Sequence, residues 1–128
     1  MNAGDAFLIE NEHGIKHLHV IVSDPVQNPD CVYLVMVSTH EERREDGCIL
    51  MKGDHPRIHH QSMVVYQKPP AVITSVSMLS KLVAKQILTP QPPVSDEVLA
   101  RIRDGCKVSK HIESRIENML YQQGLLQY

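Results

Sequence analysis

The first two-thirds of the chain carry hydrophobic patterns typical of β-strands. Val32–Thr39 is a nearly continuous apolar run of strand length, which predicts a buried central strand. Ile15–Ser23 alternates and is rich in β-branched residues, so it predicts a second strand. Shorter segments, bounded by turn residues, predict strands at Ala6–Glu10, Cys48–Lys52, Ser62–Tyr66 and Ala71–Val76. Because no helical pattern separates these strands, a parallel α/β fold is disfavoured.

The last third of the chain changes to helical spacing. Met78–Leu88 repeats apolar residues at intervals of three and four, which predicts a first helix. Thr89–Pro93 is rich in proline and predicts a connector. Ser95 predicts the N-cap of a second helix, because acidic residues fill the turn that follows it, and Gly105 predicts the end of that helix.

A third helix is predicted between Ser109, its cap, and Gly124, its end. Strands followed by segregated helices are typical of an α+β fold or of a β-barrel with appended helices. We therefore expect a mainly β, α+β chain that forms a single domain over residues 1–128. Its β-barrel core would lie in residues 1–76 and its helical part in residues 77–128.

The composition is that of a globular protein, with 42% hydrophobic and 22% charged residues in a chain of 128. Low-complexity disorder, collagen and coiled-coil arrays are therefore excluded. The chain has four Tyr, one Phe and no Trp. These are few aromatic side chains from which to form a surface that stacks on nucleic-acid bases. A net charge of −2 also separates the chain from strongly basic nucleic-acid binders.

Charge and histidine are unevenly distributed along the chain. Residues 1–64 hold five basic and ten acidic side chains, whereas residues 65–128 hold eight and five. Seven of the eight histidines lie in the acidic half. The histidines of residues 1–64 are therefore the first candidates for chemistry.

The cysteines and the chain start point to a cellular compartment. Cys31, Cys48 and Cys106 form no C-x-x-C pair and are expected to be reduced thiols. Met1–Glu10 lacks the basic stretch of a signal peptide, and no apolar run approaches roughly 18 residues. We expect a cytoplasmic protein that does not enter a membrane.

His17 and His19 lie two residues apart in a predicted strand, so their side chains share one face. Two imidazoles at this spacing resemble part of a zinc site, to which Asp54, His59 or His60 would add a ligand. Without a fixed third ligand the motif is unspecific, and a solvated or hydrogen-bonded pair is the favoured interpretation.

The same histidines suggest a second chemistry. Cleavage of a phosphodiester by an adjacent 2′-hydroxyl needs a base, an acid and a cation beside the phosphate. The candidates for proton transfer are His17, His19, His40 and His59, and the candidates for the cation are Lys16 and Arg57.

Five segments within residues 4–103 carry a resemblance to a known family. In chain order they are Gly4-Asp5 with the strand after it, Gly14–Ser23, Tyr33–Thr39, Gln61–Val65 and Val94–Ile102. Their order resembles that of the PemK/MazF-type growth-inhibitor toxins of bacterial toxin–antitoxin systems. In the second segment, Lys16 stands where the family has Arg, and His17 where it has Pro.

The resemblance implies a small SH3-like β-barrel with C-terminal helices that forms a homodimer. It also implies an endoribonuclease that cleaves single-stranded RNA without metal or cofactor and is silenced by an antitoxin protein. The family's catalytic positions fall on Lys16 and on Ser38 or Thr39. The candidate catalytic residues are then Lys16, His17, His19, Ser38 and Thr39, and the candidate substrate-binding residues are His40, Arg57, His59 and Ser62.

Two alternatives stay open beside the ribonuclease. Lysine cannot grip a phosphate with two parallel hydrogen bonds as arginine does, so Lys16 also fits a non-catalytic interaction or regulatory module of the same fold. The second alternative is a metal-binding protein that uses His17 and His19 together with His59 or His60.

Overall fold

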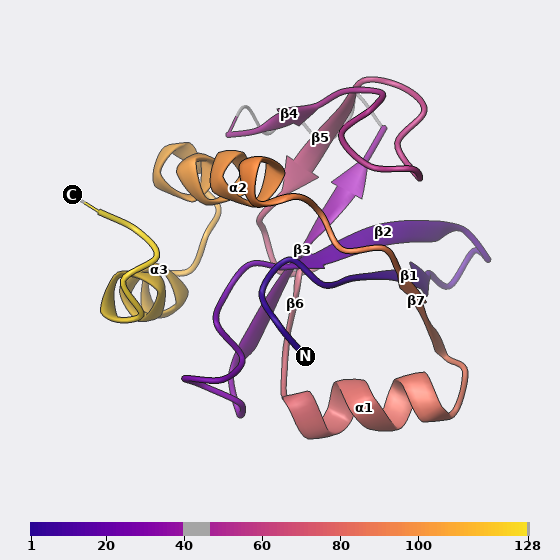
Figure 1. Ribbon diagram of the computed structural model, residues 1–128, viewed down its shortest axis with the longest axis horizontal. Helices are drawn as coiled ribbons and strands as arrows, with labels where there is room; N and C mark the ends of the chain where they lie inside the picture. The colour runs from indigo at the N-terminus through magenta and orange to yellow at the C-terminus, as the bar shows by residue number, and fades with distance from the viewer. Residues whose placement is uncertain (40–46, 128) are drawn as a thin grey trace.

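A seven-stranded antiparallel sheet forms the centre of the molecule (Figure 1). The computed structural model describes residues 1–39 and 47–127. The strands are β1 (Ala6–Glu10), β2 (Lys16–Ile21), β3 (Val32–Ser38), β4 (Ile49–Leu50), β5 (Ser62–Val65), β6 (Val72–Thr74) and β7 (Leu88–Gln91). The helices are α1 (Val76–Ala84), α2 (Asp96–Val108) and α3 (Ser114–Gln122).

β3 is the central strand, as the apolar run predicts. It pairs with β2 on one side and with β5 and β6 on the other, and all seven of its residues are buried. The strand order is β4-β5-β3-β2-β1-β7, with β6 beside β3. The mainly β, α+β class is thus confirmed. Within the described residues no pairing joins β4 to β7, so the closed SH3-like barrel stays a prediction.

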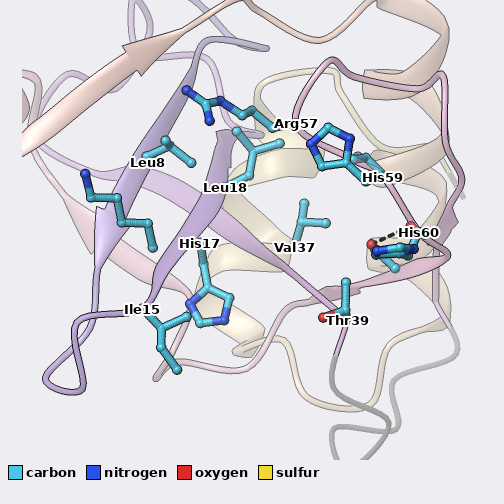
Figure 2. Close-up of a pocket in the computed structure, with 12 residues that line it drawn as sticks. Leu8, Ile15, His17, Leu18, Val37, Thr39, Arg57, His59 and His60 are labelled. Carbon is cyan, nitrogen blue, oxygen red and sulfur yellow. Dashed lines mark hydrogen bonds between the residues drawn. The ribbon is translucent and has the colours of Figure 1, made fainter.

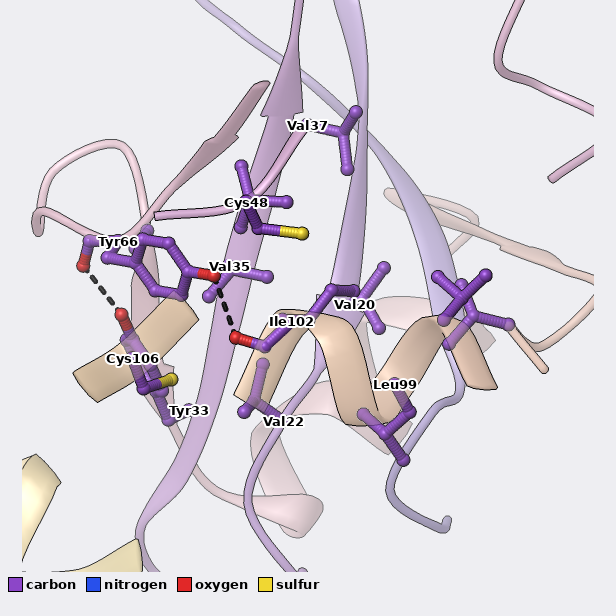
Figure 3. Close-up of a cluster of buried hydrophobic side chains, with 14 of the residues drawn as sticks. Val20, Val22, Tyr33, Val35, Val37, Cys48, Tyr66, Leu99, Ile102 and Cys106 are labelled. Atoms are coloured by element: carbon purple, nitrogen blue, oxygen red, sulfur yellow. Dashed lines mark hydrogen bonds between the residues drawn. The ribbon is translucent and has the colours of Figure 1, made fainter. Parts of the chain in front are cut away.

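The two faces of the sheet carry separate hydrophobic clusters because successive side chains in a strand point to opposite faces. One face packs against α2 and α3 and receives Leu18 and Val20 from β2 (Figure 3). The other face packs against α1 and receives Ile21 from the same strand and Phe7 from β1. Helices therefore cover both faces of the sheet (Figure 1).

Leu88–Gln91 forms a strand where the sequence predicted a connector over Thr89–Pro93. β7 pairs with β1, with Leu88 opposite Ile9, and Leu88 is buried beneath α1. Pro90 is compatible with this strand because β7 is at the edge of the sheet, where one side needs no ladder hydrogen bonds. Residues 77–128 are therefore not purely helical, and α1 ends at Ala84.

The sequence predicts some of the ends of α2 and α3 correctly and others wrongly. Ser95 is the N-cap of α2, and its hydroxyl accepts a hydrogen bond from the backbone N–H of Val98. The prediction that Gly105 ends α2 is wrong, because the helix continues to Val108. The prediction for Ser109 is also wrong: this residue follows the end of α2, and α3 begins at Ser114.

Gly124 ends α3 as predicted, in a left-handed conformation with φ of 79°. No helix among the described residues has the length and apolar character needed to cross a bilayer.

Candidate functional site

A pocket of about 350 Å³ opens at one end of the sheet, on the face that also packs against α2 (Figure 2). It lies within the size range of small-molecule sites. The residues that line it are Leu8, Ile15, Lys16, His17, Leu18, Val37, Thr39, Arg57, Ile58, His59, His60 and Ser62.

The floor of the pocket is apolar. Leu8 pairs with Leu18 and Leu18 pairs with Val37, so three neighbouring strands present these side chains on one face. Ile58 is 4% exposed and adds a fourth apolar side chain. The floor can therefore accept the apolar part of a ligand.

The strands also supply polar groups at the pocket. Lys16 lies two residues before Leu18, and Thr39 lies two residues after Val37, so each shares the face of its neighbour. Lys16 and Thr39 are exposed, whereas Ser62 is buried and donates a hydrogen bond to the carbonyl of residue 60 at 2.9 Å. Sequence positions 16, 39 and 62 thus meet at one pocket, as the resemblance implies for the first two.

Residues 51–61, here called the pocket loop, cover the remaining side. They contribute Arg57, His59 and His60, all exposed, which lie around Val37 in Figure 2. The sequence predicted His60 only as an alternative metal ligand, and not as a residue that binds RNA. Only the course of the loop brings both histidines to the pocket.

Among the described residues, the cations of the pocket form no ion pair. The side chain of Lys16 forms no hydrogen bond or ion pair with the described residues, although Glu10 lies opposite it in the pairing of β1 with β2. Arg57 donates through Nε to the side-chain oxygen of Gln91 at 2.8 Å, which leaves both terminal nitrogens for a ligand. None of the described residues that line the pocket is acidic. The site therefore favours an anionic ligand, despite the negative charge of residues 1–64.

His17 lines the pocket and is half-buried. Figure 2 places its ring beside Ile15, on the side toward Thr39. An imidazole that is partly accessible at a pocket is suited to proton transfer at a bound phosphate.

His19 does not join the pocket, which corrects the prediction. It is 4% exposed and lies on the α1 face of the sheet, because it alternates with Leu18. Its ring Nδ1 lies 3.1 Å from the carbonyl of His17. Burial lowers the pKa of His19 and so favours the neutral ring. Of the two interpretations of His17 and His19, the hydrogen-bonded one fits His19.

Ser38 is a second correction. It is 1% exposed and adjoins Val37 in β3, so it belongs to the face opposite the pocket. Of the two alternatives that the resemblance gives for the third strand, Thr39 is the one that lines the pocket. His40 lies outside the described residues.

The described part of the chain contains no group of three or more His, Cys, Asp or Glu side chains arranged to hold a metal ion. His17 and His19 share one face of β2, but two side chains do not make a metal site, and the ring Nδ1 of His19 lies 3.1 Å from the carbonyl of His17. The hypothesis of a metal site built on this pair is therefore not supported by the geometry.

Comparisons with protein-family models, with curated proteins and with solved structures returned no match. The function must therefore be argued from the pocket itself.

Proposed function

We propose that this protein is a metal-independent endoribonuclease that cleaves single-stranded RNA in the pocket. The observation that carries the proposal is the convergence of Lys16, His17, Thr39, Arg57 and His59 on one pocket, although they come from three separate segments of the chain. These residues supply cations, imidazoles and a hydroxyl, which are the groups that phosphodiester cleavage needs.

The chemistry proposed is attack by the 2′-hydroxyl of the substrate. A base accepts the proton of that hydroxyl while its oxygen bonds to phosphorus. An acid donates a proton to the 5′-oxygen while the bond between phosphorus and that oxygen breaks. The products are a 2′,3′-cyclic phosphate and a 5′-hydroxyl. His17 and His59 are the candidates for base and acid, and Lys16 and Arg57 would stabilise the charge on the phosphoryl oxygens.

The resemblance to PemK/MazF-type toxins supports the proposal at two positions. It implies catalytic roles for Lys16 and Thr39, and both residues line the pocket. It also implies a homodimer and an antitoxin partner, which we include in the proposal. A partner segment with acidic side chains would complement the cations of the pocket and compete with RNA for the site.

Incubation with single-stranded RNA of mixed sequence, in the presence of a chelator, tests the proposal. We expect discrete fragments that end in 2′,3′-cyclic phosphate. The same sequence with 2′-deoxyribose should stay intact because it lacks the nucleophile. The Lys16→Ala/His17→Ala double variant should release no fragments. Cleavage of the deoxy substrate, or full activity of the double variant, would contradict the proposed chemistry.

A second candidate is a module that binds a phosphate group without cleaving the chain. The residue at position 16 favours it, since an ammonium acts as a point charge and holds a phosphate less rigidly than a guanidinium does. Binding of RNA in the pocket, with every phosphodiester left intact, would select this candidate over the ribonuclease.

A further inference from the structure

The pocket loop is fastened to the rest of the molecule by side chains from two distant segments. Residues 51–61 are mostly outside regular strands, yet they carry Arg57, His59 and His60 to the pocket. Loop positions that must present charged side chains to a ligand need support from the surrounding structure. The described contacts reveal where this support comes from.

The first fastening is the ion pair between Asp54 and Arg101. The two terminal nitrogens of Arg101, on α2, each donate to one carboxylate oxygen of Asp54 at 3.0 Å. This is the two-pronged geometry in which arginine fixes the orientation of a carboxylate. One of the same nitrogens also donates to the carbonyl of Ile49 in β4 at 3.0 Å. Arg101 therefore joins α2, β4 and the pocket loop.

Asp54 passes this constraint to the start of the loop. Its carboxylate accepts a hydrogen bond from the backbone N–H of Met51 at 2.7 Å, and its own N–H donates to the carbonyl of Met51 at 3.0 Å. The hydrogen bond from Arg101 lowers the pKa of Asp54, so the carboxylate stays charged at neutral pH. The turn over residues 51–54 is therefore held by two hydrogen bonds between Met51 and Asp54.

The second fastening is the ring of His55, which is 3% exposed. Its Nε2 lies 2.6 Å from the carbonyl of Pro92, which can only accept, so this nitrogen carries the proton. Its Nδ1 accepts a hydrogen bond from the backbone N–H of Arg57 at 3.0 Å. The ring therefore orients the backbone of Arg57, while Gln91 holds its side chain.

We propose that Arg101, through Asp54, is a positioning residue that holds the pocket loop in the arrangement in which Arg57 and His59 face a bound phosphate. Arg101 does not line the pocket, so its effect on a ligand passes through the loop. The part of this inference that concerns phosphate rests on the proposed function. The part that concerns the loop is independent of it.

The test compares Arg101→Lys, Asp54→Asn and their double variant with Arg115→Lys. Arg115 pairs with Glu113 at 2.9 Å, near the start of α3, and serves as a matched ion-pair control. Each lysine variant keeps its positive charge; Arg101→Lys loses the two-pronged contact with Asp54, and Arg115→Lys loses the single hydrogen bond from Nε to Glu113. Amide hydrogen exchange of Arg57 and Ile58 is measured without ligand, and the affinity for inorganic phosphate is measured by titration.

We expect the two loop amides to exchange about fivefold faster or more in Arg101→Lys and in Asp54→Asn, with phosphate affinity weakened by a similar factor. The double variant should lose less than the sum of the two single variants, because both changes break the shared contact between Arg101 and Asp54. Amides of the central strand β3 and the thermal midpoint should match those of Arg115→Lys. A purely structural role would instead lower the midpoint and raise exchange throughout the sheet.

Unchanged exchange at Arg57 and Ile58 in both single variants would overturn the positioning role. Additive losses in the double variant would also overturn it, because they would mean that the two residues act separately. If the wild-type protein binds no phosphate but its loop responds as expected, the positioning of the loop stands and the proposed function fails. The same wild-type protein and variants therefore test the positioning role and the proposed function separately.

Discussion

At the scale of single residues, Gly105 and Tyr66 set how closely α2 approaches the sheet. The Tyr66 hydroxyl donates to the carbonyl of Ile102 at 2.7 Å, inside the buried cluster (Figure 3). A Cβ at position 105 would collide with that hydroxyl and would lie 2.6 Å from the carbonyl oxygen of Gly47. Gly105 is therefore a packing residue inside α2 and does not terminate the helix.

Gly105→Ala should lower the free energy of unfolding by about 1–3 kcal/mol, the usual cost of overpacking. Helix propensity alone predicts the opposite sign, a gain of roughly 1 kcal/mol. Denaturant unfolding distinguishes the two outcomes. Asp104→Ala, at the exposed neighbouring position, is the control and should have a small effect. A more stable Gly105→Ala protein would contradict the close packing.

His19 illustrates the effect of burial on one titrating group. Its ordinary pKa of 6.5 is lowered in the folded protein, chiefly because burial disfavours the charged ring. As the pH falls below 6.5, the unfolded chain binds a proton at this residue that the folded chain does not bind. The free energy of unfolding must therefore fall as the pH falls through this window.

His19→Gln should reduce this loss of stability as the pH falls below 6.5, where one such group contributes a slope of up to about 1.4 kcal/mol per pH unit. The measurement is urea unfolding at several pH values. His13→Gln is the matched control because His13 is exposed in a turn. Equal slopes in the wild-type protein and His19→Gln would show that burial does not shift this group.

At the scale of elements, some boundaries are set by local sequence signals, and other elements form only through pairing with a distant strand. The N-cap of α2 is a local signal: Ser95 precedes two acidic residues, and its hydroxyl accepts the N–H of Val98 at 3.2 Å. β7 is the opposite case, because Leu88–Gln91 contains a proline and becomes a strand only through its pairing with β1. Caps are therefore predictable from sequence, and edge strands of this kind are not.

Ser95→Ala should lower the free energy of unfolding by about 1 kcal/mol, since one N–H at the start of α2 loses its acceptor. Ser80→Ala provides the comparison because Ser80 is exposed within α1 and is not at the N-cap. That substitution should be neutral or slightly stabilising, given the helix propensity of alanine. Thermal unfolding of both variants checks the prediction. Equal midpoints would contradict the capping role of Ser95.

At the scale of the whole molecule, the strands and the class of fold follow from hydrophobic periodicity. The buried run at Val32–Thr39 predicts β3 almost to the residue, because a continuous apolar stretch has few alternatives. The candidate site was predicted less completely. Alternation places His17 and His19 on the same face of β2, opposite Leu18, but it does not indicate that His17 lines the pocket while His19 is buried.

The contacts that hold the pocket loop in place could not be predicted from the sequence. Asp54 and Arg101 are 47 positions apart, and nothing local to either residue indicates the other as its partner. Their pairing follows from where α2 packs on the sheet, which is set by the close contact at Gly105. Sites assembled from loops therefore depend on tertiary packing that a single sequence does not encode in any local pattern.

The central proposal is that the cations of the pocket serve RNA cleavage. The most direct test is the rate of cleavage of single-stranded RNA by Lys16→Ala and by Lys52→Ala. Both changes remove one exposed lysine from the acidic half, but Lys52 belongs to the pocket loop without lining the pocket. We predict a loss of roughly a hundredfold for Lys16→Ala and wild-type activity for Lys52→Ala. Equal rates for the two variants, or intact RNA with the wild-type protein, would contradict the account.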